Sequence, residues 1–161
     1  MVDIAIINAS PLIFLSRGGH IDLLLQVARR IIIPRPVATE ILARGVSDPT
    51  FQAIKHYSWL ENVDSPDIPE GIKIWNLGSG ESSVLALALK EKASEIVMDD
   101  LAGRRCAMTL NIPVRGTLGV VLMAKQKGII AQAKPVIEEL VRGGMYLSRH
   151  VLEEALKLVG E

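Results

Sequence analysis

Two adjacent carboxylates, Asp99 and Asp100, come directly after the short apolar run 96–98 and directly before a helical pattern. A short β-branched and apolar run between two helical patterns is typical of a buried strand in a parallel sheet. Open α/β sheets bind their ligands at the carboxyl ends of such strands. Because two neighbouring negative charges repel, the folded chain needs a cation beside them. A divalent metal ion is one candidate, and the guanidinium groups of Arg104 and Arg105 are the other.

Three further polar residues could join the aspartates. Asn8 follows the first predicted strand, Glu40 lies in the helical pattern after the second strand, and Glu81 lies in the first turn of a later helix. The carboxyl ends of parallel strands share one edge, so Asn8 approaches the aspartates if their strands are neighbours. Oxygen ligands suit Mg²⁺ or Mn²⁺, which activate water and neutralise the charge of a phosphodiester. The sequence therefore predicts a divalent-metal site for hydrolysis.

Each of these residues also has an ordinary structural explanation. Glu81 in a first turn stabilises the helix dipole, and Glu40 can lie on a solvated helix face. Asn8 can serve as a turn residue or a helix cap, and Asp100 can cap the helix that follows it. We favour the metal site because all of these residues fall on one predicted edge of the sheet.

The elements that must position these residues alternate between strand and helix. Strands are predicted at residues 2–7, 31–33, 59–63, 96–98 and 112–114, the third of them at a sheet edge. Helices are predicted at residues 10–16, 22–28, 36–44, 48–57, 81–92, 100–110, 117–127, 134–143 and 148–159. Ser10 is the expected N-cap of the first helix, and residues 64–71 are expected to form a loop. The alternation is typical of an α/β fold with a parallel sheet and helices on both faces.

Composition limits the function classes. The 161 residues are expected to form one domain with an aliphatic core, because 49% are hydrophobic and only 4% are aromatic. A net charge of zero argues against binding of nucleic acid by bulk charge, although a local basic patch is compatible with it. The single Cys106 excludes an internal disulfide and a multi-cysteine metal site. No apolar run is long enough to span a bilayer, so a cytoplasmic protein without a membrane partner is expected.

Five groups of residues carry a family resemblance. They are residues 8–13 (NASPLI), 33–34 with 37–41 (IP and VATEI), 77–81 (LGSGE), 98–105 (MDDLAGRR), and 116–119 with 124–125 (GTLG and AK). In order and spacing these groups resemble a PIN domain, and they are similar to a prokaryotic branch of predicted nucleic-acid-binding proteins related to VapC toxins. The resemblance extends over nearly the whole chain.

The resemblance implies a fold, an activity and a set of residues. The fold is α/β, a three-layer α/β/α sandwich around a mainly parallel central sheet, in one domain over residues 1–161 with C-terminal helices at about 134–159. The activity is cleavage of RNA with Mg²⁺ or Mn²⁺ as cofactor. The implied catalytic residues are Glu40, Glu81, Asp99 and Asp100, and the implied metal ligands are Asn8, Glu81, Asp99 and Asp100. Beside the resemblance, Ser10, Arg104 and Thr117 are candidate substrate contacts; Arg104 follows the acids closely enough to reach a phosphate, and a salt bridge on the helix surface is its structural alternative.

Asn8 is a departure from the family pattern. PIN nucleases usually carry an aspartate at the end of the first strand, where its carboxylate is a principal metal ligand. An asparagine carbonyl oxygen can still bind a hard cation, but it brings no charge to the site. We therefore expect weaker metal binding and reduced activity.

Three functions remain open at this point. The leading hypothesis is a metal-dependent endoribonuclease, in its most specific form the toxin of a toxin–antitoxin pair, with an antitoxin protein as partner and a homodimer as the implied assembly. The alternative is a catalytically weak or inactive PIN-like module that binds nucleic acid or a protein. The third is a phosphohydrolase that uses the same acidic edge, because a sheet alone does not determine the substrate.

Overall fold

The computed structural model describes residues 1–92 and 95–161, and within these residues five parallel strands form one sheet. The strand order is β3-β2-β1-β4-β5, so β3 lies at an edge, as predicted. The strands are β1 (Val2–Ile7), β2 (Ala28–Pro34), β3 (Leu60–Val63), β4 (Glu95–Val97) and β5 (Val114–Arg115). The chain places β2 and β3 on one side of β1, and then β4 and β5 on the other. In open α/β sheets ligands bind at such a reversal of strand order, which here lies at the carboxyl ends of β1 and β4.

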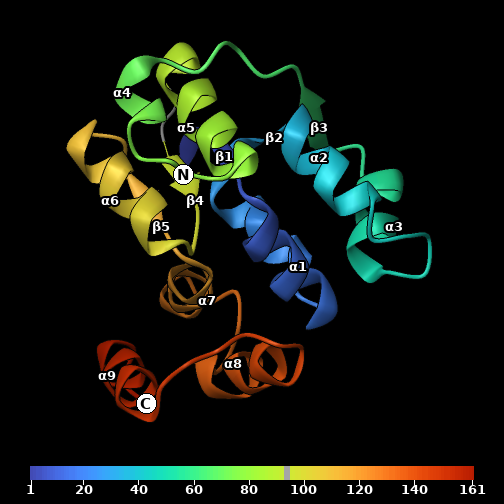
Figure 1. Ribbon diagram of the computed structural model, residues 1–161. Helices are drawn as coiled ribbons and strands as arrows, with labels where there is room; N and C mark the ends of the chain where they lie inside the picture. The colour runs from blue at the N-terminus through green and yellow to red at the C-terminus, as the bar shows by residue number, and fades with distance from the viewer. Residues whose placement is uncertain (93–94) are drawn as a thin grey trace.

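Helices cover both faces of the sheet, which confirms the predicted α/β/α arrangement (Figure 1). The helices are α1 (Ala9–Arg17), η1 (Ile21–Gln26, a 3₁₀ helix), α2 (Arg35–Leu42), α3 (Pro49–His56), α4 (Glu70–Lys73), α5 (Ser79–Glu91), α6 (Leu101–Thr109), α7 (Thr117–Gln126), α8 (Ala133–Arg142) and α9 (Arg149–Leu158). In Figure 1, α4, α5 and α6 lie on one side of the strands, and α1, α3 and α7 lie on the other. Helices α8 and α9 lie beyond α7, farthest from the sheet. Within the described residues, no helix is both long and apolar enough to cross a membrane.

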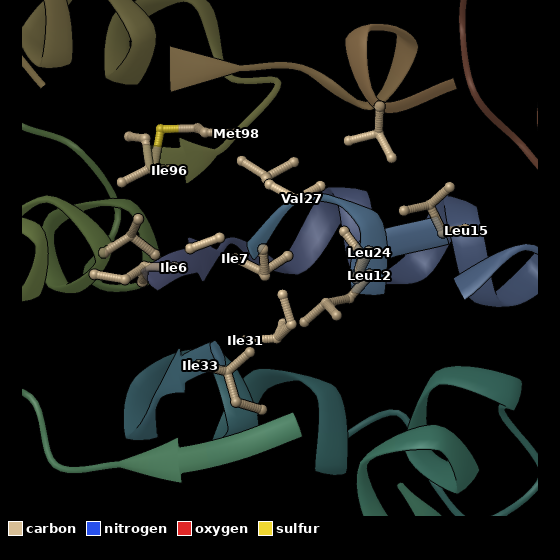
Figure 2. Packing of buried hydrophobic residues seen from close by; sticks show 14 of the residues in the cluster. Ile6, Ile7, Leu12, Leu15, Leu24, Val27, Ile31, Ile33, Ile96 and Met98 are labelled. Atoms are coloured by element: carbon tan, nitrogen blue, oxygen red, sulfur yellow. The ribbon is translucent and has the colours of Figure 1, made fainter. Parts of the chain in front are cut away.

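The core is aliphatic, as the composition predicts. Figure 2 shows Ile7 and Ile31 from adjoining strands beside Leu12 of α1 and Leu24 of η1, and all four side chains are at most 1% exposed. β-Branched and leucine side chains fill such an interior at near-crystalline density without needing polar partners. Cys106 is buried and unpaired in α6.

Several predicted boundaries are wrong, each for a local reason. The second strand begins at Ala28 rather than at residue 31, because β2 pairs with β1 from Val2 onward. The predicted helix at 22–28 is the 3₁₀ helix η1. Glu70, predicted in a loop, begins the short helix α4. The last strand is Val114–Arg115 instead of 112–114, since Arg115 pairs with Val97.

The first helix begins earlier than the sequence pattern indicates. Asn8 rather than Ser10 is the N-cap residue of α1, and Ser10 lies inside the first turn. The backbone N–H of Asn8 donates to Val97 O at 3.0 Å, and Ile7 lies opposite Val97 in the sheet. Strands β1 and β4 are therefore neighbours, and Asn8 and Asp99 follow their carboxyl ends at the same edge of the sheet.

Candidate functional site

Asn8 lies at the junction between β1 and α1, with only 1% of its surface exposed. Its side chain makes no capping hydrogen bond; instead Nδ2 donates to Glu81 Oε1 at 3.3 Å. Because a carboxylate only accepts, this contact fixes which end of the amide faces Glu81. The carbonyl oxygen Oδ1 is buried and meets no hydrogen-bond donor within residues 1–92 and 95–161. An unsatisfied buried carbonyl costs about 1–3 kcal/mol, so this atom points to a ligand.

Gly80, in the first turn of α5, lies next to both Asn8 Oδ1 and the Glu40 carboxylate. A Cβ atom on Gly80 would lie 3.4 Å from Glu40 Oε2 and 3.5 Å from Asn8 Oδ1. Both oxygens therefore border one small space that the glycine leaves open. We call Asn8, Glu40 and Glu81 the Asn8 cluster.

Gly78 has a comparable steric role just before this turn. A Cβ atom on this residue would lie only 2.6 Å from Glu81 Oε2. The carboxylate of Glu81 thus lies against the backbone that leads into α5, and a larger residue at position 78 would displace it. The backbone at Gly78 has φ −61°, so the role of this glycine is the close approach of Glu81 and not an unusual backbone conformation.

Asp99, which follows β4, has a different environment. Its Oδ1 accepts from the backbone N–H of Thr117 at 2.8 Å, and its Oδ2 accepts from Thr117 Oγ1 at 2.6 Å. Thr117 opens α7 and is completely buried. The first turn of α7 therefore fixes both oxygens of a half-buried aspartate. Contact between Thr117 and a substrate stays a prediction; the partner that the structure shows is Asp99.

Arg104 lies next to this pair. Its Nη1 donates to Met98 O at 3.3 Å, and a Cβ atom on Gly116 would lie 2.5 Å from that nitrogen and 3.1 Å from Asp99 Oδ1. The absence of a side chain at Gly116 thus allows the guanidinium and the carboxylate to approach the same stretch of backbone. We call Asp99, Thr117 and Arg104 the Asp99 cluster.

Asp100 and Ser10 lie at the borders of these clusters. Asp100 is exposed and caps α6, accepting from the backbone N–H of Gly103 at 2.8 Å, as the structural alternative proposed. Ser10 is half-buried in the first turn of α1. Their predicted roles as a metal ligand and as a substrate contact stay predictions.

The chemistry of this edge suits a cation only in part. No three histidine, cysteine, aspartate or glutamate side chains of the described chain come close enough together to hold a metal ion. The Asn8 cluster supplies two carboxylates and a neutral amide oxygen that has no donor. Oxygen ligands of this kind fit a hard cation such as Mg²⁺ or Mn²⁺, but one charge is missing compared with a three-carboxylate site. The donor set therefore fits a weakly held divalent ion.

Comparison with known families agrees with the fold. The DUF3368 family model, described as a PIN domain, matches residues 4–161. The chain belongs to this PIN-domain family. No curated protein matches the chain at a significant level. The resemblance inferred from the motifs is therefore confirmed at the level of the family. PIN domains have a nuclease fold and generally use divalent metal ions.

The least expected contacts in this PIN domain come from residues without charge. The sequence placed Gly78 and Gly80 only in a motif before the predicted helix at 81–92, and it did not pair Thr117 with Asp99. The motif at 77–81 did contain a signal, because two glycines immediately before an acidic residue permit close approach to a carboxylate. The link between Thr117 and Asp99 joins residues 18 positions apart, and only the neighbouring position of β4 and β5 reveals it.

Proposed function

We propose that this PIN domain is a divalent-metal-dependent endoribonuclease that binds its metal weakly because Asn8 replaces a carboxylate. The observation that carries the proposal is the buried oxygen Oδ1 of Asn8, which lacks a donor within the described residues and borders the same space as the Glu40 carboxylate. A hard cation would satisfy this oxygen and balance the charges of Glu40 and Glu81.

The residues of the two clusters have distinct roles in this proposal. Asn8, Glu81 and Asp99 would hold Mg²⁺ or Mn²⁺, which, when bound, supplies an activated water and neutralises charge on the phosphodiester. Glu40, which is exposed, accepts the proton of the attacking water. Thr117 keeps Asp99 in one orientation, and Arg104 binds a phosphate oxygen. Asp100 stabilises the start of α6 and thereby the backbone that carries Asp99.

The more specific biological role rests on the motif resemblance alone. We extend the proposal to a VapC-like toxin that cleaves cellular RNA in the cytoplasm, forms a homodimer and is restrained by an antitoxin protein. The order of the motifs from residue 8 to residue 125 supports this extension.

A second candidate function is binding without cleavage, by a PIN-like module that has lost its catalysis. The neutral side chain of Asn8 favours it, as does the lack, in the described part of the chain, of three acidic side chains around one point. The two candidates differ in one property, because only the nuclease needs a bound metal.

The test is a calorimetric titration of Mn²⁺ into the metal-free protein, combined with cleavage of a single-stranded RNA. Glu81→Gln keeps the hydrogen bond from Asn8 but removes a charge, so we expect it to abolish both Mn²⁺ binding and cleavage. Asp3→Asn is the matched control, because Asp3 is an exposed acid near the start of β1. It therefore lies at the amino ends of the strands, whereas the candidate site lies at their carboxyl ends. Binding and cleavage that survive in Glu81→Gln would refute the assignment. Absence of both in the wild type, with Mn²⁺ binding gained by Asn8→Asp, would establish the second candidate.

A further inference from the structure

A pocket of about 630 Å³ opens at the same edge of the sheet as the Asn8 cluster. It is lined by Arg35, Pro36, Thr39, Asp64, Ser65 and Ser79. These residues come from the start of α2, from the segment after β3, and from the start of α5. We call it the Arg35 pocket.

The pocket and the candidate metal site are built from the same two helices. Thr39 immediately precedes Glu40 in α2, and Ser79 immediately precedes Gly80 in α5. Gly80 is the residue whose missing side chain leaves room between Glu40 Oε2 and Asn8 Oδ1. A ligand beside Gly80 therefore lies next to residues whose immediate neighbours in the chain line the pocket.

The lining of the pocket is rich in hydrogen-bond donors. Arg35 brings a guanidinium group, and Thr39, Ser65 and Ser79 bring hydroxyl groups. Guanidinium groups bind phosphate oxygens with two parallel hydrogen bonds, and serine and threonine hydroxyls also contact the sugar–phosphate backbone. Such a donor set suits a phosphate and the ribose attached to it.

Arg35 is available for such a ligand even though it has an acidic neighbour. Its Nη2 lies 2.5 Å from Asp64 Oδ1, but the two side chains are 68% and 82% exposed. Ion pairs this exposed contribute little, so a phosphate can replace the carboxylate as the partner of Arg35. The Arg115–Glu95 pair differs in this respect, because its glutamate is only 9% exposed and the arginine is held within the sheet.

We propose that the Arg35 pocket binds a phosphate of single-stranded RNA next to the bond that is cleaved. This inference rests on the proposed nuclease function and adds a direction to it: the RNA runs from the Asn8 cluster across the starts of α5 and α2. Asp64 weakens this binding, because its carboxylate competes with the phosphate for Arg35 and repels it.

The experiment measures fluorescence anisotropy of a labelled single-stranded RNA of ten nucleotides over a range of salt concentrations, with EDTA present so that no metal is available. Arg35→Gln is expected to weaken binding several-fold for every RNA sequence. It should also make the salt slope shallower by about 0.7, because one phosphate is no longer neutralised by the protein. Asp64→Asn is expected to strengthen binding. Opposite effects of Arg35→Gln and Asp64→Asn on RNA affinity would show that a phosphate of the RNA competes with Asp64 for Arg35.

Matched controls come from a second exposed ion pair. Arg29 and Asp3 form a contact of 2.9 Å, and their side chains are 72% and 76% exposed. Both residues lie near the amino ends of their strands, away from the carboxyl ends where the pocket opens. Arg29→Gln and Asp3→Asn change the net charge by the same amounts, and we expect neither to alter RNA affinity beyond a small shift common to all sequences. Circular dichroism melts confirm that all four variants fold.

The outcomes separate this inference from the proposed function. If Arg35→Gln weakens RNA binding no more than Arg29→Gln does, the phosphate site is overturned and the nuclease proposal stays intact. The pocket would then be tested for a protein ligand. In Mn²⁺, the site also predicts a higher KM with unchanged kcat for Arg35→Gln. Wild-type protein that neither binds nor cleaves RNA would overturn both proposals.

Discussion

The two clusters at the carboxyl edge of the sheet satisfy their polar atoms in opposite ways. In the Asp99 cluster, Thr117 alone gives one hydrogen bond to each carboxylate oxygen of Asp99. In the Asn8 cluster, the single side-chain contact is at 3.3 Å and the carbonyl oxygen of Asn8 has no donor within the described residues. Buried groups that are satisfied by the protein are preorganised, whereas an unsatisfied group is stabilised by a ligand. The Asp99 cluster is therefore the fixed half of the site, and the Asn8 cluster is the half that a cation completes.

The largest effect is expected from breaking the fixed half. Thr117→Val removes the hydroxyl that donates to Asp99 Oδ2 at 2.6 Å, in a fully buried position. Removal of a residue that orients a metal ligand costs about 10–100-fold in metal affinity or activity. The unpaired carboxylate oxygen also lowers the free energy of unfolding by about 1–3 kcal/mol. Mn²⁺ calorimetry and urea unfolding measure the two effects.

The control for this change is Thr109→Val. Thr109 Oγ1 donates to Arg105 O at 3.0 Å, but the residue is exposed at the last position of α6. A hydroxyl bonded to its own helix contributes little, so this variant is expected to change the free energy of unfolding by less than about 0.5 kcal/mol. Equal effects of the two variants would show that Thr117 does nothing specific for Asp99.

The next effect comes from giving the open half the charge it lacks. Asn8→Asp replaces the Nδ2 donor with an oxygen that faces Glu81 Oε1, so two carboxylates oppose each other without metal. We expect the metal-free variant to be less stable by about 1–3 kcal/mol and to bind Mn²⁺ at least about tenfold more tightly than the wild type. Thermal melts with EDTA and with Mn²⁺ should therefore shift in opposite directions relative to the wild type. A variant that melts like the wild type in both buffers would contradict a metal site at Asn8.

A smaller effect is expected from closing the space between the two oxygens of the Asn8 cluster. Gly80→Ala places a methyl group 3.4 Å from Glu40 Oε2 and 3.5 Å from Asn8 Oδ1, which are ordinary contact distances. Alanine also favours the helix by up to about 1 kcal/mol, so the variant should be as stable as the wild type or more stable. Mn²⁺ binding should nevertheless weaken several-fold, because the methyl group occupies the space where a ligand of Asn8 Oδ1 would lie. Weaker Mn²⁺ binding in a variant that is at least as stable as the wild type cannot be explained by loss of the fold. Unchanged Mn²⁺ affinity would show that this space is not the metal site.

The sequence predicts the architecture well because strand and helix periodicities are local signals. The alternation of apolar runs and helical patterns was sufficient for a parallel sheet, and the order of motifs was sufficient for the PIN family. Boundaries were less predictable: β2 begins at Ala28 although charged residues follow at once, because pairing with β1 overrides the polar character of this stretch.

The state of each polar atom in the site could not be predicted from residue types. Asp99 and Asp100 look equivalent in the sequence, yet one is held by Thr117 of a distant helix and the other caps its own helix. Which of these occurs depends on the position of β5 beside β4, a long-range property. The capping role of Asp100 was foreseen as an alternative because it depends only on the next three residues.

The smallest expected effect is on the pH dependence of the free energy of unfolding, and it comes from Glu61, a carboxylate outside the site. The guanidinium of Arg30 donates two hydrogen bonds to Glu61, at 3.1 and 2.8 Å, and holds the pKa of that carboxyl below its ordinary value. A lowered pKa in the folded state adds stability above the ordinary glutamate pKa, and this stability disappears as the pH falls through the folded value. Because the side chains are 51% and 38% exposed, we expect only a few tenths of a kcal/mol, which disappear below about pH 4. Urea unfolding of Glu61→Gln at pH 7 and at acidic pH measures it: the variant should be slightly less stable at pH 7 and equal to the wild type at low pH. Any larger acid sensitivity that persists in Glu61→Gln then comes from other groups of the protein and not from the Arg30–Glu61 pair.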